Sequence, residues 1–208
     1  MGRLDSGESG GMAQCSKKYR LISHASKLGA ARAALLDTAD IVVRADLAQR
    51  CRNPRCENYA LSPGCPPHVG GPAAMRKELR RHRQALFFAL DLPTQALLTR
   101  SRREGFRRLH EMAADIERQA LAAGYDQARA YVGGACKAIF CQEQADCRVL
   151  EGTGACRYPE KARASMSGYG IDVGRLIDLA GWGRCEGALN SAATPAAMTS
   201  LYGLVLLA

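Results

Sequence analysis

Hydrophobic and polar positions along the chain predict four strands and three helices. Short apolar runs, which are typical of strands, occur at residues 39–44, 85–90, 127–132 and 201–207. Apolar residues at three- and four-residue spacing predict a long helix from Thr99 to Ala123, and Gly124 is placed to end it. Shorter helices are predicted at 73–84 and 171–180.

Strands that alternate with helices predict an α/β or α+β fold, with a single sheet, flanking helices and two cysteine-rich loops. A chain of 208 residues is long enough for one domain with its own core. Residues 1–16 contain Gly and Ser without apolar periodicity, so we expect a flexible leader before a single domain at 17–208. The longest apolar run is too short to cross a bilayer, and we expect no membrane span.

Nine cysteines add candidate chemistry to this framework. The first residues do not resemble a secretory signal, so we expect a cytoplasmic protein in a reducing compartment, where stable disulfides are rare. Seven cysteines lie in two loops rich in Gly and Pro, and they are Cys51, Cys56 and Cys65 in the first loop and Cys136, Cys141, Cys147 and Cys156 in the second. Cys15 and Cys185 stand alone, and we expect them to serve in packing.

Thiolates that converge in tight turns are typical of a metal site. The spacing favours iron–sulfur over zinc, because neither loop contains the closely spaced Cys-x-x-Cys pairs of most zinc sites. The second group supplies four thiolates, whereas the first supplies three and leaves one metal position open or filled by His68. A mixed site with ligands from both loops is also compatible with the spacing.

Basic residues give the chain a net charge of +9. Arg157, Lys161 and Arg163 follow Cys156 closely, so we expect them to offset the charge of a cluster or to bind an anionic substrate. Two further basic helix faces carry Arg76, Lys77, Arg80, Arg81 and Arg83, and Arg100, Arg102, Arg103, Arg107 and Arg108. We expect these to be solvated helix faces, with docking of an acidic redox partner as an alternative, and not a nucleic-acid site, because aromatic stacking rows and known binding motifs are missing.

Two longer stretches of sequence contain motifs that indicate a protein family. Cys51-Arg-Asn-Pro-Arg-Cys56-Glu-Asn-Tyr59 is followed by Cys65-Pro-Pro, and Gly133-Gly-Ala-Cys136 leads through Gly154-Ala-Cys156-Arg-Tyr-Pro159 to Gly168-Tyr-Gly-Ile-Asp-Val173. In these motifs the chain resembles the DUF2284 family of predicted metal-binding proteins, over roughly residues 35–205. The resemblance implies a cytoplasmic prokaryotic protein that binds metal as iron–sulfur, and it implies no particular reaction.

Two hypotheses result from these patterns. The first is an iron–sulfur protein whose two cysteine groups hold one or two [4Fe–4S] clusters, for electron transfer or for chemistry at an open iron. The alternative is a structural zinc protein whose basic faces bind a partner. Nucleophile triads, phosphate loops and dinucleotide fingerprints are missing, so the sequence assigns no catalytic residue, and it predicts no oligomeric state.

Overall fold

The computed structural model describes residues 8–183 and 197–208, with side chains from residue 17 onward. These residues form one five-stranded sheet in the order β1-β2-β5-β3-β4. The strands are β1 (Arg32–Asp37), β2 (Gln84–Pro93), β3 (Arg129–Val132), β4 (Ala164–Ser165) and β5 (Met198–Leu207). Neighbouring strands run antiparallel except for β3 and β4, which are parallel. The fold class is therefore α+β, as predicted.

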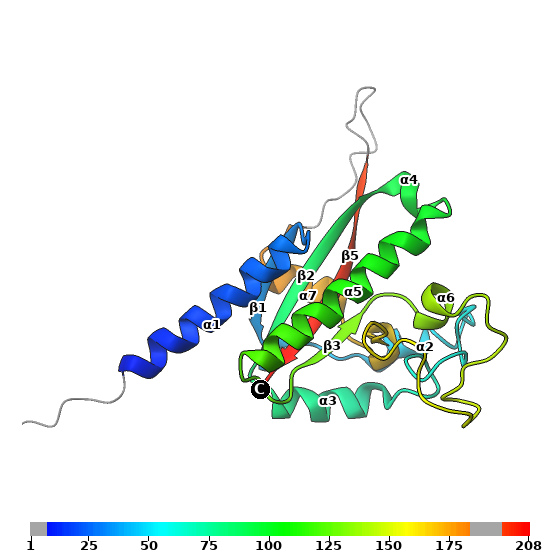
Figure 1. The fold of residues 1–208 in the computed structure, drawn as a ribbon, viewed down its shortest axis with the longest axis horizontal. Helices are drawn as coiled ribbons and strands as arrows, with labels where there is room; N and C mark the ends of the chain where they lie inside the picture. Colours follow the sequence, from blue (N-terminus) through cyan, green and yellow to red (C-terminus); the bar gives the residue numbers. More distant parts are fainter. Residues whose placement is uncertain (1–7, 184–196) are drawn as a thin grey trace, which may run out of the picture.

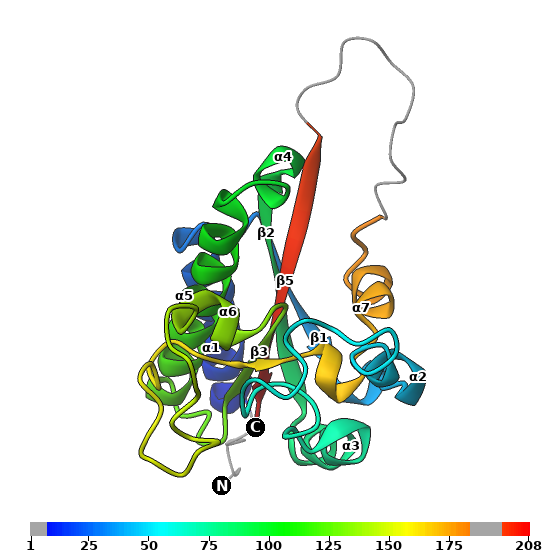
Figure 2. The same ribbon diagram turned by 90° about the vertical axis from the view of Figure 1, so that its right-hand side faces the viewer.

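Helices cover both faces of the sheet, which Figure 2 shows from its edge. One face is covered by α1 (Glu8–Lys27) and α5 (Ser101–Ala122), and the other by α2 (Ala45–Gln49), α3 (Gly71–Arg81) and α7 (Val173–Leu179). The remaining short elements are α4 (Thr94–Leu97), α6 (Cys136–Phe140) and the 3-10 turns η1 (Thr38–Asp40) and η2 (Ser167–Tyr169). The molecule thus has three layers.

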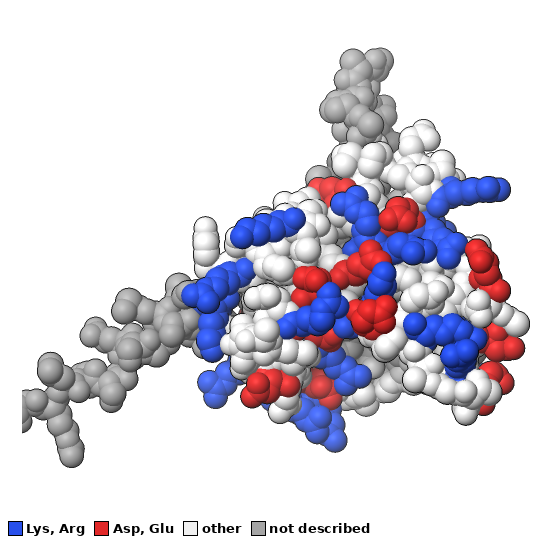
Figure 3. Space-filling model, viewed as in Figure 1, with Lys and Arg blue, Asp and Glu red and all other residues white. Residues whose placement is uncertain are grey.

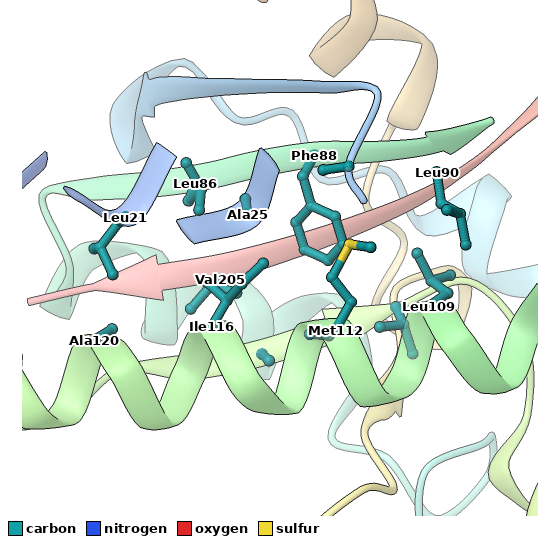
Figure 4. Close-up of a cluster of buried hydrophobic side chains, with 14 of the residues drawn as sticks. Leu21, Ala25, Leu86, Phe88, Leu90, Leu109, Met112, Ile116, Ala120 and Val205 are labelled. Carbon is teal, nitrogen blue, oxygen red and sulfur yellow. The ribbon is translucent and has the colours of Figure 1, made fainter. Parts of the chain in front are cut away.

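The inner strand β2 is apolar at residues 85–90 because both of its faces are covered. Leu86 and Phe88 point toward α1 and α5, where they pack with Met112 and Ile116 (Figure 4). Phe87 lies on the opposite face of the sheet, in the core formed with α3 and α7. Successive strand residues face opposite sides, so a strand between two cores needs hydrophobic residues at every position.

Most of the predicted elements are confirmed. The long helix is α5, and Gly124 follows its end with a φ of 87°, which a residue with a side chain rarely adopts. The strands predicted at 85–90, 127–132 and 201–207 are β2, β3 and β5, and the shorter predicted helices are α3 and α7. No helix among the described residues is both long enough and apolar enough to cross a membrane.

The prediction of a strand at residues 39–44 is wrong. The first strand is Arg32–Asp37, and the chain then turns through η1 because the Asp37 carboxylate accepts a hydrogen bond of 2.9 Å from the Ala39 amide. Ile41 is buried in the core beside α3 and α7, so this apolar residue serves packing and not a strand ladder. Val43 forms only an isolated bridge with Ile171.

The predicted leader overlaps the first helix. Residues 1–7 lie outside the described part of the chain, and α1 begins at Glu8. Its second half packs on the sheet through Leu21 and Ala25, which are fully buried in the core with α5. The first half of α1 extends away from the rest of the molecule (Figure 1). The division into a leader and a single domain stays a prediction.

Both cysteine loops lie at the same end of the molecule, near α6 (Figure 1). The first loop is joined to the edge of the sheet by a hydrogen bond of 2.9 Å from the Ser165 amide to the Gly64 carbonyl. A Cβ atom on Gly64 would lie 3.3 Å from Cα of Ala164, so the loop passes close against β4. The second loop runs from the end of β3 through α6 back to β4. The fold therefore brings the two loops together.

Candidate metal centre

The first cysteine loop is a series of tight turns between α2 and α3. The Cys51 amide bonds to Ala48 O at 3.2 Å, and the Cys56 amide bonds to Cys51 O at 3.0 Å. Cys65 closes a further turn, through a bond of 3.1 Å from its amide to Ser62 O. These turns place all three side chains around one cavity. Cys56 is exposed, Cys51 is half-buried and Cys65 is buried.

The second loop begins with α6, which carries Cys136 at its start and is ended by Cys141. The Lys137 ammonium folds back over the loop and donates to Cys141 O at 2.9 Å and also to Gln144 O. The Tyr158 amide donates to the sulfur of Cys156 at 3.4 Å. All four cysteines of this loop are half-buried, and all four line a second cavity.

Ser62 lies where the two groups of cysteines meet. Its side chain is buried, with the residue only 1% exposed, and its oxygen has no partner at hydrogen-bonding geometry among the described residues. The hydroxyl is close enough to the thiols of Cys65 and Cys136 to lower the pKa of both. The two groups are therefore neighbours and share one buried hydroxyl.

Burial dominates the electrostatics of the thiols. It raises the pKa of Cys136 to about 11, against the effect of Ser62, and the neighbouring thiols of Cys65, Cys156 and Cys147 raise it further. Burial is also the first cause of the raised pKa of Cys65 and of Cys51. Several thiolates at such close quarters repel one another, so a bound cation is needed to hold them all ionised.

The two cavities differ greatly in size. The cavity lined by Cys51, Cys56 and Cys65 has a volume of about 610 Å³ and opens to solvent. The cavity lined by the four cysteines of the second loop has a volume of about 30 Å³ and is more enclosed. The first has room for a small organic molecule, and the second has room for a single ion or one or two water molecules.

Aromatic side chains form the walls of the smaller cavity. Phe140 and Tyr158 both line it and stack with their ring centroids 5.4 Å apart. Behind them the fully buried His110 meets the Phe140 ring edge-on at 5.5 Å, and its Nδ1 accepts a hydrogen bond of 3.1 Å from the Arg163 amide. Burial, followed by the charge of Arg163, lowers the pKa of His110 to about 4, so this imidazole is neutral at pH 7.

The three cations predicted to lie beside a cluster have different surroundings. Arg157 lines the smaller cavity with the thiols and donates to Asp146 O at 3.3 Å. Lys161 instead pairs with Glu111 of α5 at 2.8 Å, and Arg163 forms a largely buried ion pair with Glu117 at 2.5 Å. The structure therefore brings Arg157 to the thiols and uses the other two to attach the loop to α5.

His68 is not brought to the thiols. Its side chain is exposed, its Nε2 is 3.3 Å from Ala60 O, and it does not line either thiol cavity. In residues 17–183 and 197–208, no three His, Cys, Asp or Glu side chains form a ready-made ion site. The donors present are nonetheless those that a soft metal prefers, seven thiols in two adjacent groups with a buried hydroxyl and an amide directed at sulfur.

Sequence reasoning missed Ser62 and the aromatic walls of the smaller cavity. A signal for Ser62 existed, because it lies three residues before Cys65 in Ser-Pro-Gly-Cys, where a turn places it close to the thiol. Phe140 and Tyr158 lie next to Cys141 and two residues after Cys156, but only the folded loop stacks them. Cys15 lies in α1 outside the described side chains, and Cys185 lies outside the described residues.

Comparison with known proteins agrees with this chemistry. The family model named predicted metal-binding protein (DUF2284) matches residues 34–207, which include both cysteine loops and the whole sheet except for the first two residues of β1. No curated protein and no solved structure matches the chain. The match covers far more than half of the sequence and all seven clustered cysteines, so the chain belongs to the DUF2284 family of predicted metal-binding proteins.

Proposed function

We propose that this chain is a cytoplasmic iron–sulfur protein in which Cys51, Cys56 and Cys65 hold a [4Fe–4S] cluster with one open iron. The cysteines of the second loop form a closed four-thiolate centre beside it. A cluster held by three thiolates supplies a Lewis-acidic iron in addition to electron transfer. The main support is the contrast between three thiols on an open cavity of about 610 Å³ and four thiols around an enclosed one of about 30 Å³.

The protein's own groups have separable roles in this proposal. The thiolates bind the metal, and the Tyr158 amide donates a hydrogen bond to the sulfur of Cys156. The Ser62 hydroxyl adjoins Cys65 and Cys136 and favours their ionised forms, because it lowers the pKa of both thiols. Phe140 and Tyr158 exclude water from the second centre. Because the two groups adjoin at Ser62, electrons would have a short path between two centres.

A structural zinc ion is the second candidate for the four-cysteine group. Its cavity of about 30 Å³ suits a single ion better than an iron–sulfur cube, which would require the loop to open. The other part of the zinc alternative, a partner bound to the basic faces, has less support than the zinc ion itself. On the face in Figure 3 the basic residues of α5 alternate with acidic ones, and Arg107 and Arg118 pair with Glu104 and Asp115. An acidic redox partner stays a proposal.

Metal and acid-labile sulfide analysis after anaerobic purification tests the proposal. Iron with equal sulfide supports clusters, whereas zinc without sulfide supports the alternative. Cys51→Ala and Cys156→Ala should each lose metal, and Cys15→Ala, outside both loops, should retain it. Full metal retention in both loop variants would refute binding by these cysteines.

Accessibility of the iron needs a separate measurement. Cyanide or a small thiol is added to the reduced protein, and its paramagnetic resonance spectrum is recorded. We expect one cluster signal to shift in the wild type and in Cys156→Ala, because the open position belongs to the first group. Spectra that do not change with any added ligand would contradict an open iron. Electron transfer would then remain as the only proposed role of the cluster.

A further inference from the structure

The open cavity beside the first cysteine group continues into a second, larger one. The neighbouring cavity has a volume of about 970 Å³ and lies between the start of α5 and α6. Arg102, Phe106 and the backbone of Gly134 line both cavities. The two spaces therefore form one groove, which has the thiols of Cys51, Cys56 and Cys65 at one end and the basic start of α5 at the other.

Arg102 is the cation at the junction of the two cavities. Its guanidinium lies 5.7 Å from the centroid of the Phe106 ring, which holds it over the groove. In the described part of the chain no carboxylate lies within 4.0 Å of it, whereas Arg107 on the same helix pairs with Glu104 at 3.7 Å. Arg103 is also engaged, because its Nε donates to Ile139 O at 2.8 Å. The exposed Arg102 thus lines both cavities, and its guanidinium has no hydrogen-bond acceptor among the described residues.

Both arginines and carboxylates line the groove, and the arginines outnumber the carboxylates. The cations that line it are Arg50, Arg100, Arg102 and Arg103, and the anions are Glu57, Glu143 and Asp172. Asp172 lies 3.6 Å from Arg44, which also pairs with Asp46 at 2.8 Å, and it accepts a bond of 3.1 Å from the Arg175 amide. Glu57 and Glu143 are exposed, and so are Arg50, Arg100 and Arg102. The residues that line the groove therefore include one more arginine than carboxylates, and Arg102 lies where its two cavities meet.

The walls between Arg102 and the thiols are largely apolar. Leu47, Phe106, Ile171 and Val173 line the cavity on the thiol side. Small-molecule sites are typically apolar clefts with a few placed polar groups, and both volumes here are in the range of such sites. Apolar walls with a guanidinium suit a ligand that has an organic body and one anionic group.

We propose that this groove binds a small organic anion, with Arg102 holding its carboxylate or phosphate group and its body reaching toward Cys51, Cys56 and Cys65. This inference rests on the proposed function, because it assigns a substrate class to the same open metal position. Arg102 acts on the ligand directly, through charge-assisted hydrogen bonds. The thiol end of the groove is where the ligand would meet the metal.

Binding of two matched anions to the anaerobically purified full chain tests this inference. Benzoate and phenyl phosphate share an aromatic body and distinguish a carboxylate from a phosphate, and benzamide is the neutral control. Calorimetric titration should show binding of at least one anion and none of benzamide. Arg102→Gln should weaken that binding about tenfold, the usual result of losing a hydrogen bond to a charged group.

Arg108→Gln is the matched control variant, because Arg108 is an exposed arginine on the same helix that lines neither cavity of the groove. It should bind the anion with unchanged affinity. The inference is overturned if neither anion binds, if benzamide binds equally well, or if Arg102→Gln and Arg108→Gln behave alike.

The metal analysis separates this inference from the proposed function. Arg102-dependent anion binding in a protein without iron or sulfide would support the groove and refute the cluster. Conversely, a cluster with an accessible iron and no anion binding would support the proposed function and overturn the groove. In a protein that has both, adding the anion should also shift the paramagnetic signal of the accessible cluster in the wild type more than in Arg102→Gln.

Discussion

The sheet and the cysteine loops of this protein are stabilised in different ways. In β2 six successive residues, 85–90, are at most 2% exposed, and their side chains fill two cores. In the second loop no residue from 141 to 157 is buried. Apolar burial stabilises the sheet, whereas the loop is held by turn hydrogen bonds and a few side-chain hydrogen bonds such as those of Lys137 and Arg157. We therefore expect the sheet to fold without metal and the loop to depend on metal for its order.

The polar and charged side chains of the two regions also have different kinds of partner. The ion pair between Arg163 and Glu117 and the neutral His110 tie the end of the second loop to α5. Further into the loop, Lys137 bonds only to backbone carbonyls, and the thiols crowd together. We therefore expect the boundary between a self-supporting core and a metal-dependent loop near residue 158, where Tyr158 stacks on Phe140.

The largest expected effect on the free energy of unfolding comes from truncating a buried side chain of the core. Phe88 is fully buried and faces Gly203 of β5, where an added Cβ would lie 2.2 Å from the Phe88 ring. Phe88→Ala should lower the free energy of unfolding by about 3–5 kcal/mol, because the ring leaves a cavity that this close packing cannot fill. Urea titration followed by circular dichroism measures this. Leu98→Ala, at a residue 79% exposed, should change it by about 0.5 kcal/mol or less.

A loss close to zero in Phe88→Ala would mean that the core is not the stabilising region. A loss in Leu98→Ala as large as that in Phe88→Ala would lead to the same conclusion.

The second prediction concerns the boundary between the two regions. Burial lowers the pKa of His110 to about 4, below the value of about 6.5 in an unfolded chain. As the pH falls through this window, the unfolded state binds a proton before the folded state does, so stability is lost. The loss should reach about 3 kcal/mol at most. Urea titrations at about pH 7 and about pH 4.5 measure it.

His110→Asn separates this effect from loss of metal in acid. Asparagine has an oxygen that can accept the Arg163 amide bond and does not titrate in this range. The variant should lose much less stability between the two pH values than the wild type does. His68→Asn, at an exposed residue of the first loop, should behave like the wild type. Equal pH dependence in wild type and His110→Asn would contradict the assignment.

Sequence alone predicted the core well for a physical reason. Burial on both faces of β2 and β5 produces continuous apolar runs, and the buried stripe of α5 produces a clear helical period. It failed at β1, where Ala33 and Ala34 have little strand preference, and at α1, whose first residues are rich in Gly and Ser.

The cysteine groups could be predicted because seven cysteines lie in two short stretches of the chain, and the structure brings the two groups together as neighbours. The contrast between the cavities was not visible, because it depends on residues far apart in sequence. Arg102, Phe106 and Gly134 meet Cys51 only in the folded protein. Gly134 allows this approach, with a φ of 90° and no Cβ, which would lie 2.7 Å from the Phe106 ring.

The third prediction tests whether removal of the metal disorders the cysteine loops but not the core. Removal of the metal by an anaerobic chelator should leave the helical circular dichroism nearly unchanged, because the sheet and α5 are packed without it. Trypsin cleavage at exposed loop arginines such as Arg52 and Arg148 should rise about tenfold, because local opening no longer costs a bound metal. Cleavage after Arg118, on α5, is the internal control.

Mass spectrometry of the fragments gives the cleavage rate at each site. Loop cleavage that stays the same after complete metal removal would contradict metal-dependent order. Equal acceleration at Arg118 would show instead that the whole domain opens.

The smallest expected effect is at Ser62, where the two cysteine groups meet. Its buried hydroxyl lowers the pKa of Cys65 and Cys136, and its oxygen has no partner at hydrogen-bonding geometry among the described residues. Metal binding requires deprotonated thiols, so Ser62→Ala should weaken metal affinity about tenfold, as loss of an outer hydrogen bond to a ligand usually does. Competition with a chelator measures this affinity. Ser26→Ala, on α1, should leave it unchanged, and equal affinity in Ser62→Ala would mean that the two groups bind metal independently of their shared hydroxyl.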